Sequence, residues 1–246
     1  MDAHVGVLKI TDGCPFRCTY CSVPLVVPNF VARPLEDCLE ELEYLARLGT
    51  RHVAFYDDAL LFRPDRVLLP FLDEVMKRGL RFSFHTPNAL NARFITPEIA
   101  RMMVQAGFKT FFLGFESSAY DWQHKTGGKV YSEEFREAVR ALRGAKAALI
   151  TAYIIIGHPE TEGQNLDRSM RFAAQEGVRV MLSEFAPIPG TPDGEVCRAM
   201  TNLDEPLHHN KTAFTWRFLG RERVDSLKAL CRQLNREQVA ERVAHI

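Results

Sequence analysis

TDGCPFRCTYCS, residues 11–22, carries three cysteines in the spacing C-x3-C-x2-C, on a glycine- and proline-bearing loop that follows an apolar run. Three thiolates this close in the chain, those of Cys14, Cys18 and Cys21, can hold a metal ion or a cluster. A four-iron cluster normally takes four cysteines, one for each iron. Three cysteines leave one iron open, and an open coordination position is where a metal site performs chemistry.

Other roles for these cysteines are weakly supported by their number and spacing. A structural zinc site usually has four ligands in paired spacings, whereas only one C-x2-C step is present. A disulfide framework is opposed by the remaining three cysteines, which are scattered and odd in number: Cys38, Cys197 and Cys231. We expect Cys38 and Cys231 to be small buried hydrophobic residues.

The motif resembles the signature of the radical S-adenosylmethionine (SAM) superfamily, C-x3-C-x-aromatic-C, in which Tyr20 fills the aromatic position. The resemblance implies a 4Fe–4S cluster on Cys14, Cys18 and Cys21, with SAM chelated to the open iron. It also implies that one electron breaks the sulfonium bond of SAM and that the 5′-deoxyadenosyl radical takes hydrogen from a substrate. A low-potential flavodoxin or ferredoxin is the expected reductant, and the protein is expected to be sensitive to oxygen.

Composition limits the other possibilities. The chain has 246 residues, of which 46% are hydrophobic, and its 31 basic residues balance its 31 acidic residues. This balance indicates neither a nucleic-acid nor an anionic membrane partner. Without a signal peptide or an apolar span of about 18 residues, the expected address is the reducing cytoplasm. We predict one domain, residues 1–246, with a barrel over 1–192 and a C-terminal extension with a helix over 193–246.

Apolar runs alternate with helix-period segments six times, which predicts an α/β fold with a parallel sheet covered by helices. This alternation fits an open doubly wound sheet and a barrel-like sheet equally. The resemblance implies the second, a partial (β/α)6 TIM-like barrel with a C-terminal helix. The predicted strands are residues 5–11, 52–56, 81–84, 110–115, 149–156 and 179–185, and the predicted helices include 34–48, 65–78, 132–144 and 221–243.

Polar and small residues follow the predicted strands, where parallel α/β folds place their chemistry. Asp58, Asn88 and Ser117 could equally be helix caps or turn residues. The resemblance assigns SAM-binding roles around the second, fourth, fifth and sixth strands and beside the nucleoside. The residues it selects are Phe16, Tyr20, Asp57, Asp58, Glu116, Ile156, Gly157 and Pro187.

Candidate catalytic residues facing a substrate are His85, His158 and Glu184, because histidine and carboxylate side chains can transfer protons. The ending Pro187-Ile-Pro-Gly-Thr-Pro192 is similar to that of cobalamin-binding radical SAM proteins and methylthiotransferases, and we expect their accessory domains to be absent. Two alternatives stay open. One is a non-catalytic iron–sulfur electron-transfer protein with a fourth ligand such as Cys197, and the other is a methyl- or methylthiotransferase-like enzyme that needs a separate partner.

Overall fold

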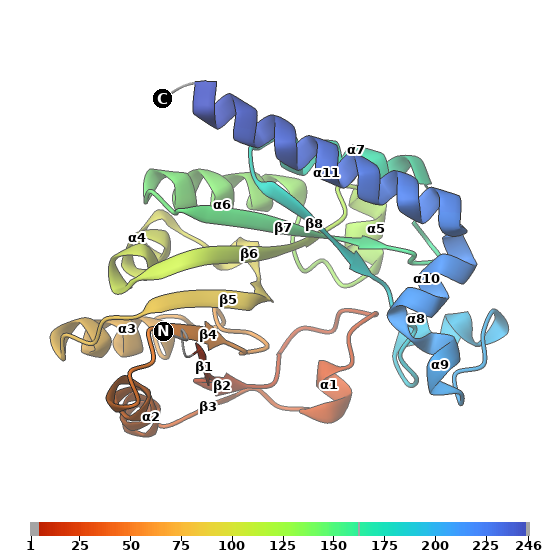
Figure 1. The fold of residues 1–246 in the computed structure, drawn as a ribbon. Coiled ribbons are helices and arrows are strands. Elements are labelled where there is room, and N and C mark those ends of the chain that lie inside the picture. Colours follow the sequence, from red (N-terminus) through yellow and green to blue (C-terminus); the bar gives the residue numbers. More distant parts are fainter. Residues whose placement is uncertain (1–4, 162, 245–246) are drawn as a thin grey trace. The chain divides into compact units, whose positions relative to one another are not determined.

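The computed structural model describes residues 5–161 and 163–244. Its main sheet has six strands in the order β1-β4-β5-β6-β7-β8, and the pairs β1–β4, β4–β5, β5–β6 and β7–β8 are parallel (Figure 1). This confirms the predicted α/β class and is consistent with a partial (β/α)6 barrel. The strands are β1 (Val5–Leu8), β4 (His52–Phe55), β5 (Ser83–Leu90), β6 (Phe108–Glu116), β7 (Leu149–Ile156) and β8 (Arg179–Glu184).

The chain divides into two compact units, each with its own internal contacts. The first unit comprises Met1–Pro15, Val26–Leu113 and Glu133–Ile150. The second comprises Phe16–Leu25, Gly114–Ser132 and Thr151–Ile246. The prediction of one domain over residues 1–246 stays a prediction.

In the first unit, aromatic side chains from three strands form the core. Phe55, Phe84 and Phe108 are buried, and their ring centroids lie 5.2–5.4 Å apart. The helices are α2 (Leu35–Arg47), α3 (Leu68–Lys77), η1 (Ala92–Phe94), α4 (Pro97–Ala106) and α6 (Ser132–Gly144). Both ends of α4 are capped. At its N-terminus the Thr96 side chain accepts from the Ile99 amide, and at its C-terminus Gly107 ends the helix with φ 112°.

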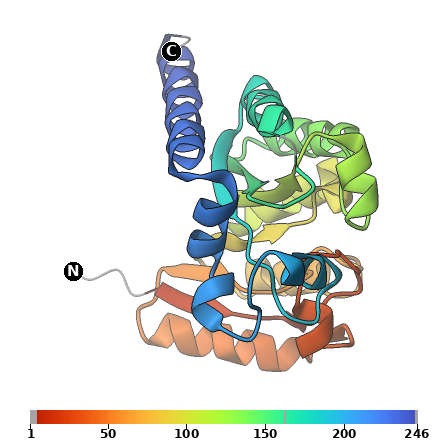
Figure 2. The same cartoon turned by 90° about the vertical axis from the view of Figure 1, so that its right-hand side faces the viewer.

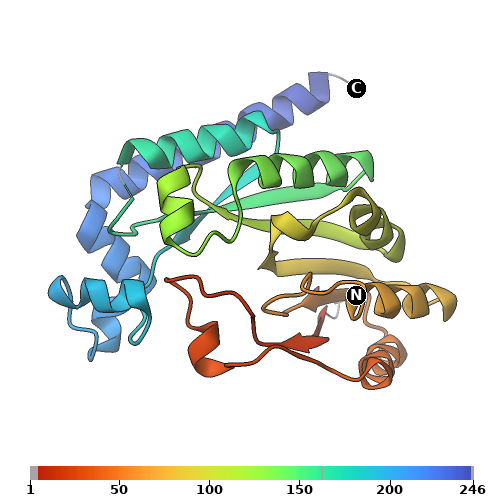
Figure 3. The same cartoon turned by 180° about the vertical axis from the view of Figure 1, so that it is seen from behind.

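Several predicted strand boundaries are off by one or two residues, and two strand ends differ by three residues or more. The first strand ends at Leu8, and the short β2 (Thr11–Asp12) pairs antiparallel with β3 (Val31–Ala32) (Figure 3). The change of direction follows from a side chain, because the Ile10 and Thr11 amides donate to Asp57 Oδ1. β5 continues to Leu90, beyond the predicted end at residue 84.

In the second unit, β7 pairs with β8, and α11 (Arg221–Ala244) lies along β8 and α7 (Gly163–Gln175) (Figures 1 and 2). Asn235 of α11 binds the edge of β8 at Val180, because its side chain both accepts from the Val180 amide and donates to the Val180 carbonyl, each at 2.8 Å. Strand pairing with another chain is therefore blocked at this residue.

The segment after β8 contains short helices that hydrophobic periodicity is too coarse to predict. They are α8 (Pro192–Val196), η2 (Cys197–Ala199), α9 (Pro206–His209) and α10 (Lys211–Leu219). Two more short helices lie earlier in this unit or at its border, α1 (Val23–Val26) and α5 (Tyr120–Lys125). Within the described residues, no helix has the length and apolar character to cross a membrane.

Candidate functional site

Residues 13–22, which we call the cysteine loop, connect β2 to α1. None of its three cysteines is in a disulfide; Cys18 is buried, and Cys14 and Cys21 are half-buried. Cys14 lies in the first unit, and Cys18 and Cys21 lie in the second. Among the residues that the structure describes, no three or more His, Cys, Asp or Glu side chains are gathered as metal ligands. The donor set itself, three cysteine thiols within eight residues and outside any disulfide, has the chemistry that an iron–sulfur cluster requires.

In the first unit, two carboxylates after β4 hold the chain that enters the cysteine loop. Asp57 Oδ1 accepts from the Ile10 amide at 2.9 Å, from the Thr11 amide at 2.6 Å and from the Thr11 hydroxyl at 2.7 Å. Asp58 Oδ2 accepts from the Gly13 amide at 3.2 Å and lies 3.6 Å from Lys9 Nζ. Both side chains predicted to contact SAM are therefore committed, at least in part, to the residues just before Cys14.

The second oxygen of Asp57 is different. Asp57 Oδ2 is buried and has no hydrogen-bond partner among the described residues. Burial raises the pKa of Asp57 to about 6, although the bonds from Thr11 and Ile10 act in the opposite direction. An unpartnered buried acceptor fits a ligand that brings a donor, such as the ammonium group of SAM.

In the second unit, Thr19 is bonded on three sides. Its hydroxyl donates to Asp193 Oδ2 at 2.7 Å, its carbonyl accepts from the Asp193 amide at 3.1 Å, and its own amide donates to the Thr126 carbonyl at 3.3 Å. Gly127, at φ 105°, permits this approach, since a Cβ there would lie 3.0 Å from the Arg17 carbonyl oxygen. The C-x2-C step is thus held by residues far from it in sequence.

Tyr20 and Glu116, two residues predicted to bind SAM, lie in the same unit. Tyr20 stacks on Trp122, with ring centroids 5.9 Å apart and an interplanar angle of 16°. Burial raises the pKa of Tyr20 well above its usual range, and the negative charge of Glu116 adds to the effect. The environment therefore keeps the Tyr20 hydroxyl protonated.

Glu116 ends β6 in an unusual backbone conformation, with φ 67°. Its side chain is buried, and Oε1 lies 3.5 Å from Lys129 Nζ. Burial raises the pKa of Glu116, and Lys129 partly opposes this. A Cβ on Gly114 would lie 2.5 Å from Lys129 Nζ, so glycine at that position makes room for the pair. Neither Lys129 nor its pairing with Glu116 was predicted from the sequence.

The candidate His158 is 1% exposed and fully engaged. Its Nδ1 accepts from Trp122 Nε1 at 3.3 Å and from the Glu160 amide at 3.2 Å. Because Nδ1 accepts two bonds, the ring proton is on Nε2, which donates to Asp193 Oδ2 at 2.8 Å. Asp193 therefore joins His158 to Thr19.

His85 and Glu184, the other two candidates, lie in different units. His85 is near the beginning of β5, where Nε2 lies 3.0 Å from His52 Nδ1 and Nδ1 lies 3.0 Å from Thr110 Oγ1. Its predicted position at the end of a strand is wrong, because β5 continues for five more residues, to Leu90.

Glu184 does lie at the end of its strand, β8. Its carboxylate accepts from the Thr212 hydroxyl at 2.6 Å and lies 2.8 Å from Lys228 Nζ. Burial alone would raise the pKa of Glu184, but the bonds from Lys228 and Thr212 lower it. Glu184 is thus a paired, ionised carboxylate, which is a poor proton donor.

Packing in the second unit explains the positions of three residues predicted to bind SAM, Gly157, Ile156 and Pro187. Gly157 has φ 84°, and a Cβ there would lie 2.4 Å from Thr215 Oγ1, so glycine admits α10 to this strand end. Ile156 and Pro187 are buried, and Phe16 is half-buried. Their contact with a nucleoside stays a prediction.

Cys197, suggested as a fourth ligand, is fully buried in an apolar cluster. Burial raises the pKa of its thiol to about 11, so it is a poor source of thiolate. The other members of this cluster are Trp122, Ile155, Phe185 and Phe214.

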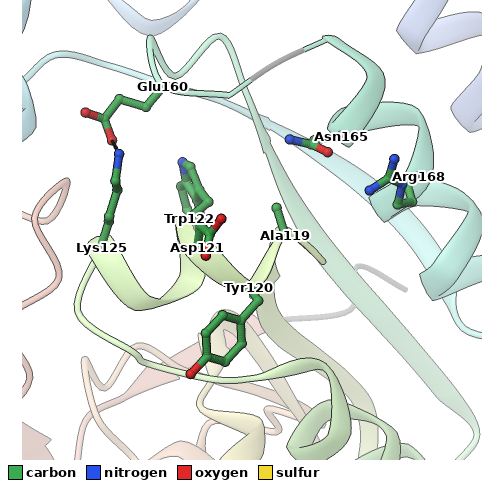
Figure 4. Close-up of a pocket in the computed structure, with 8 residues that line it drawn as sticks. All are labelled: Ala119, Tyr120, Asp121, Trp122, Lys125, Glu160, Asn165 and Arg168. Carbon is green, nitrogen blue, oxygen red and sulfur yellow. Dashed lines mark ion pairs between the residues drawn. The ribbon is translucent and has the colours of Figure 1, made fainter.

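A pocket of about 350 Å³ lies over α5 and the first turns of α7, with Trp122 in its lining. Figure 4 shows Lys125 and Glu160 on one side, paired at 3.7 Å, and Asn165 and Arg168 on the other. The sequence contains no motif that would reveal it.

A parallel α/β sheet whose first strand leads into a three-cysteine loop defines the class of protein. The Radical SAM superfamily profile matches residues 8–173, and the chain belongs to this superfamily, whose members use a 4Fe–4S cluster and SAM.

Relatives in sequence are methyl- and methylthio-transferring proteins. The chain is 28% identical over 189 residues to the bacteriochlorophyllide d C-12(1)-methyltransferase of Chlorobaculum tepidum, covering 74% of this chain and 40% of the relative. It is 24% identical to the tRNA-2-methylthio-N(6)-dimethylallyladenosine synthase of Aromatoleum aromaticum, covering 96% of this chain and 57% of the relative. The chain thus spans about half the length of these two relatives.

Solved structures show the same fold. The radical SAM methyltransferase TsrM from Kitasatospora setae, with tryptophan substrate and aza-SAM bound, matches with a TM-score of 0.74 and 17% identity, over 94% of this chain and 52% of that chain. Methylornithine synthase (PylB) matches with a TM-score of 0.60 and 14% identity, over 91% of this chain and 62% of that chain.

Proposed function

We propose that the chain is the catalytic core of a radical SAM enzyme, in which Cys14, Cys18 and Cys21 hold a 4Fe–4S cluster. The cysteine motif, within a chain that belongs to the superfamily, carries the proposal. Held by these three cysteines, a reduced cluster would supply the one electron needed for reductive cleavage of the C5′–S bond of SAM, which would yield methionine and the 5′-deoxyadenosyl radical for hydrogen abstraction from the substrate.

The chain's own residues bind and orient SAM in this proposal. Glu116 accepts hydrogen bonds from the ribose hydroxyls or the ammonium group, and Asp57 Oδ2 offers a second acceptor. Tyr20, Phe16 and Ile156 provide apolar surface for the nucleoside. Gly157, Asp58 and Pro187 shape the backbone around this site rather than contact the reacting bond.

The experiment is anaerobic reconstitution with iron and sulfide, followed by SAM and dithionite and measurement of 5′-deoxyadenosine by mass spectrometry. The wild-type protein is expected to hold about four iron atoms per chain and to release 5′-deoxyadenosine. Cys18→Ala should do neither, and Cys231→Ala, which changes a thiol bonded to the Val180 carbonyl, should match the wild type. Cleavage of SAM by Cys18→Ala at the wild-type rate would remove the proposal.

A fourth protein ligand would instead indicate an electron-transfer protein, but the burial of Cys197 speaks against that residue. A second candidate function is methyl or methylthio transfer with the help of a partner, and the names of the two relatives favour it. S-adenosylhomocysteine formed alongside 5′-deoxyadenosine would support methyl transfer. The absence of both products when candidate partners are added would exclude it.

A further inference from the structure

We propose that His158 and Asp193 are positioning residues that hold the C-x2-C step of the cysteine loop, so that the spacing of Cys18 and Cys21 is set before any cluster binds. We call His158, Asp193 and Thr19 the loop brace. The inference rests on the proposed function only in taking Cys18 and Cys21 as cluster ligands.

The first observation is the continuity of the hydrogen bonds. His158 Nε2 and the Thr19 hydroxyl both donate to one oxygen, Asp193 Oδ2, at 2.8 and 2.7 Å. The Asp193 amide adds a third bond, to the Thr19 carbonyl. Hydrogen bonds to a carboxylate are stronger than hydrogen bonds between neutral groups, and two donors on one oxygen fix the position of that oxygen.

The second observation is that His158 reaches the other residue of the step as well. Trp122 donates to His158 Nδ1 at 3.3 Å and stacks on Tyr20 with centroids 5.9 Å apart. Thr19 and Tyr20 are the only two residues between Cys18 and Cys21. Both are therefore held through His158, one by polar contacts and one by aromatic contacts.

The third observation is that the brace itself is rigid. The His158 ring is 1% exposed and meets the rings of Trp122 and Phe185 at 85° and 65°. The Asp193 side chain is 16% exposed and sits in α8, whose first turn is capped by the Thr191 side chain. A histidine packed against two aromatic rings and bonded at both nitrogens is suited to holding another group in place, and both of its nitrogens are already engaged.

The test measures thiol alkylation in the reduced apoprotein, so it does not depend on activity. A short pulse of iodoacetamide, followed by peptide mass spectrometry, gives the rates at Cys18 and Cys21, with Cys231 of the same chain as the reference. Thr19→Val and His158→Phe should raise both rates about tenfold by releasing the loop, whereas Thr19→Ser, which keeps the hydroxyl, should restore the wild-type rates.

Thr201→Val is the matched control, because the buried Thr201 hydroxyl donates to the His208 carbonyl and no bond joins it to the cysteine loop. It should leave the rates at Cys18 and Cys21 unchanged. Circular dichroism confirms that each variant is folded, and Asp193→Ala, which removes the acceptor of both bonds and should give the same rise, replaces any variant that is not. Wild-type alkylation rates in folded Thr19→Val, or an equal rise in Thr201→Val, would overturn the brace.

Reconstituted protein separates this proposal from the proposed function. With the brace intact, we expect iron transfer to a chelator to be about tenfold slower than in Thr19→Val. If the wild type takes up iron and the variant loses it no faster, the brace is wrong and the cluster assignment stands. If the wild type takes up no iron, the cluster assignment is wrong, and the alkylation rates still decide whether the brace holds the loop.

Discussion

Glu116 and Lys129 form a largely buried ion pair, in which Oε1 lies 3.5 Å from Nζ, and the backbone of Glu116 is held at φ 67°. A non-glycine residue in this region costs about 1–3 kcal/mol, and such strain is concentrated at functional sites. The strain therefore supports a functional role for Glu116, because packing alone would be better served by a relaxed residue.

We expect Glu116→Asn to be more stable than Glu116→Gln by about 1 kcal/mol, since asparagine tolerates positive φ. Both variants remove the charge next to Lys129, so the comparison isolates the backbone strain. Both should lose SAM binding as measured by isothermal titration of reconstituted protein. A Glu116→Gln variant that binds SAM as tightly as wild type would show that the carboxylate is not a ligand.

Asp57 makes stability depend on pH. Its pKa of about 6 in the folded chain lies above the ordinary value of about 3.9, so the folded state binds the proton more tightly than the unfolded state. This contribution is present below pH 4 and is lost as the pH rises through 6. Relative to Asp57→Asn, the wild-type apoprotein should lose about 2 kcal/mol of unfolding free energy between pH 4 and 7. The unfolding free energies of both proteins are measured in urea at each pH, and the prediction is wrong if they change with pH in the same way.

His85, near the start of β5, acts in the opposite direction. Burial, and the charge of the adjacent His52, lower the pKa of His85. A lowered pKa gives stability that is present above about pH 6.5 and is lost as the pH falls through the folded-state value. His52→Asn should therefore weaken the acid sensitivity of the apoprotein between pH 7 and 5. The exposed His124→Asn should leave it as in wild type, and equal effects would refute the pairing.

The turn that carries Asp193 is expected to require glycine at position 194. A Cβ there would lie 1.9 Å from the Ile188 carbonyl oxygen, a rigid backbone atom, so Gly194→Ala should destabilise the protein by about 1–3 kcal/mol or more. Gly144→Ala, in a helix with nothing within 4 Å, should stabilise it by up to about 1 kcal/mol. Thermal unfolding measures both. A Gly194→Ala variant as stable as wild type would mean that the turn relaxes freely.

The sequence alone predicts the α/β class, the six strands and the membership of a family built around three cysteines. These features are local, because strands and helices follow hydrophobic periodicity and the cysteine motif occupies eight consecutive residues. The boundaries were less well predicted. Asp57 turns the chain away from the sheet after Leu8, and its bonds to Ile10 and Thr11 cross more than 45 positions of sequence.

The contacts of the candidate residues depend on tertiary packing and could not be predicted from the sequence. His158 and Asp193 are 35 residues apart, and Thr19 and Asp193 are 174 apart, so no spacing in the sequence could pair them. The same holds for His85, whose ring reaches that of His52 across the β4–β5 pair although its register partner is Ala54. A histidine's chemistry depends on its neighbours and its burial, and these are set by the packing of distant segments rather than by the motif in which it is found.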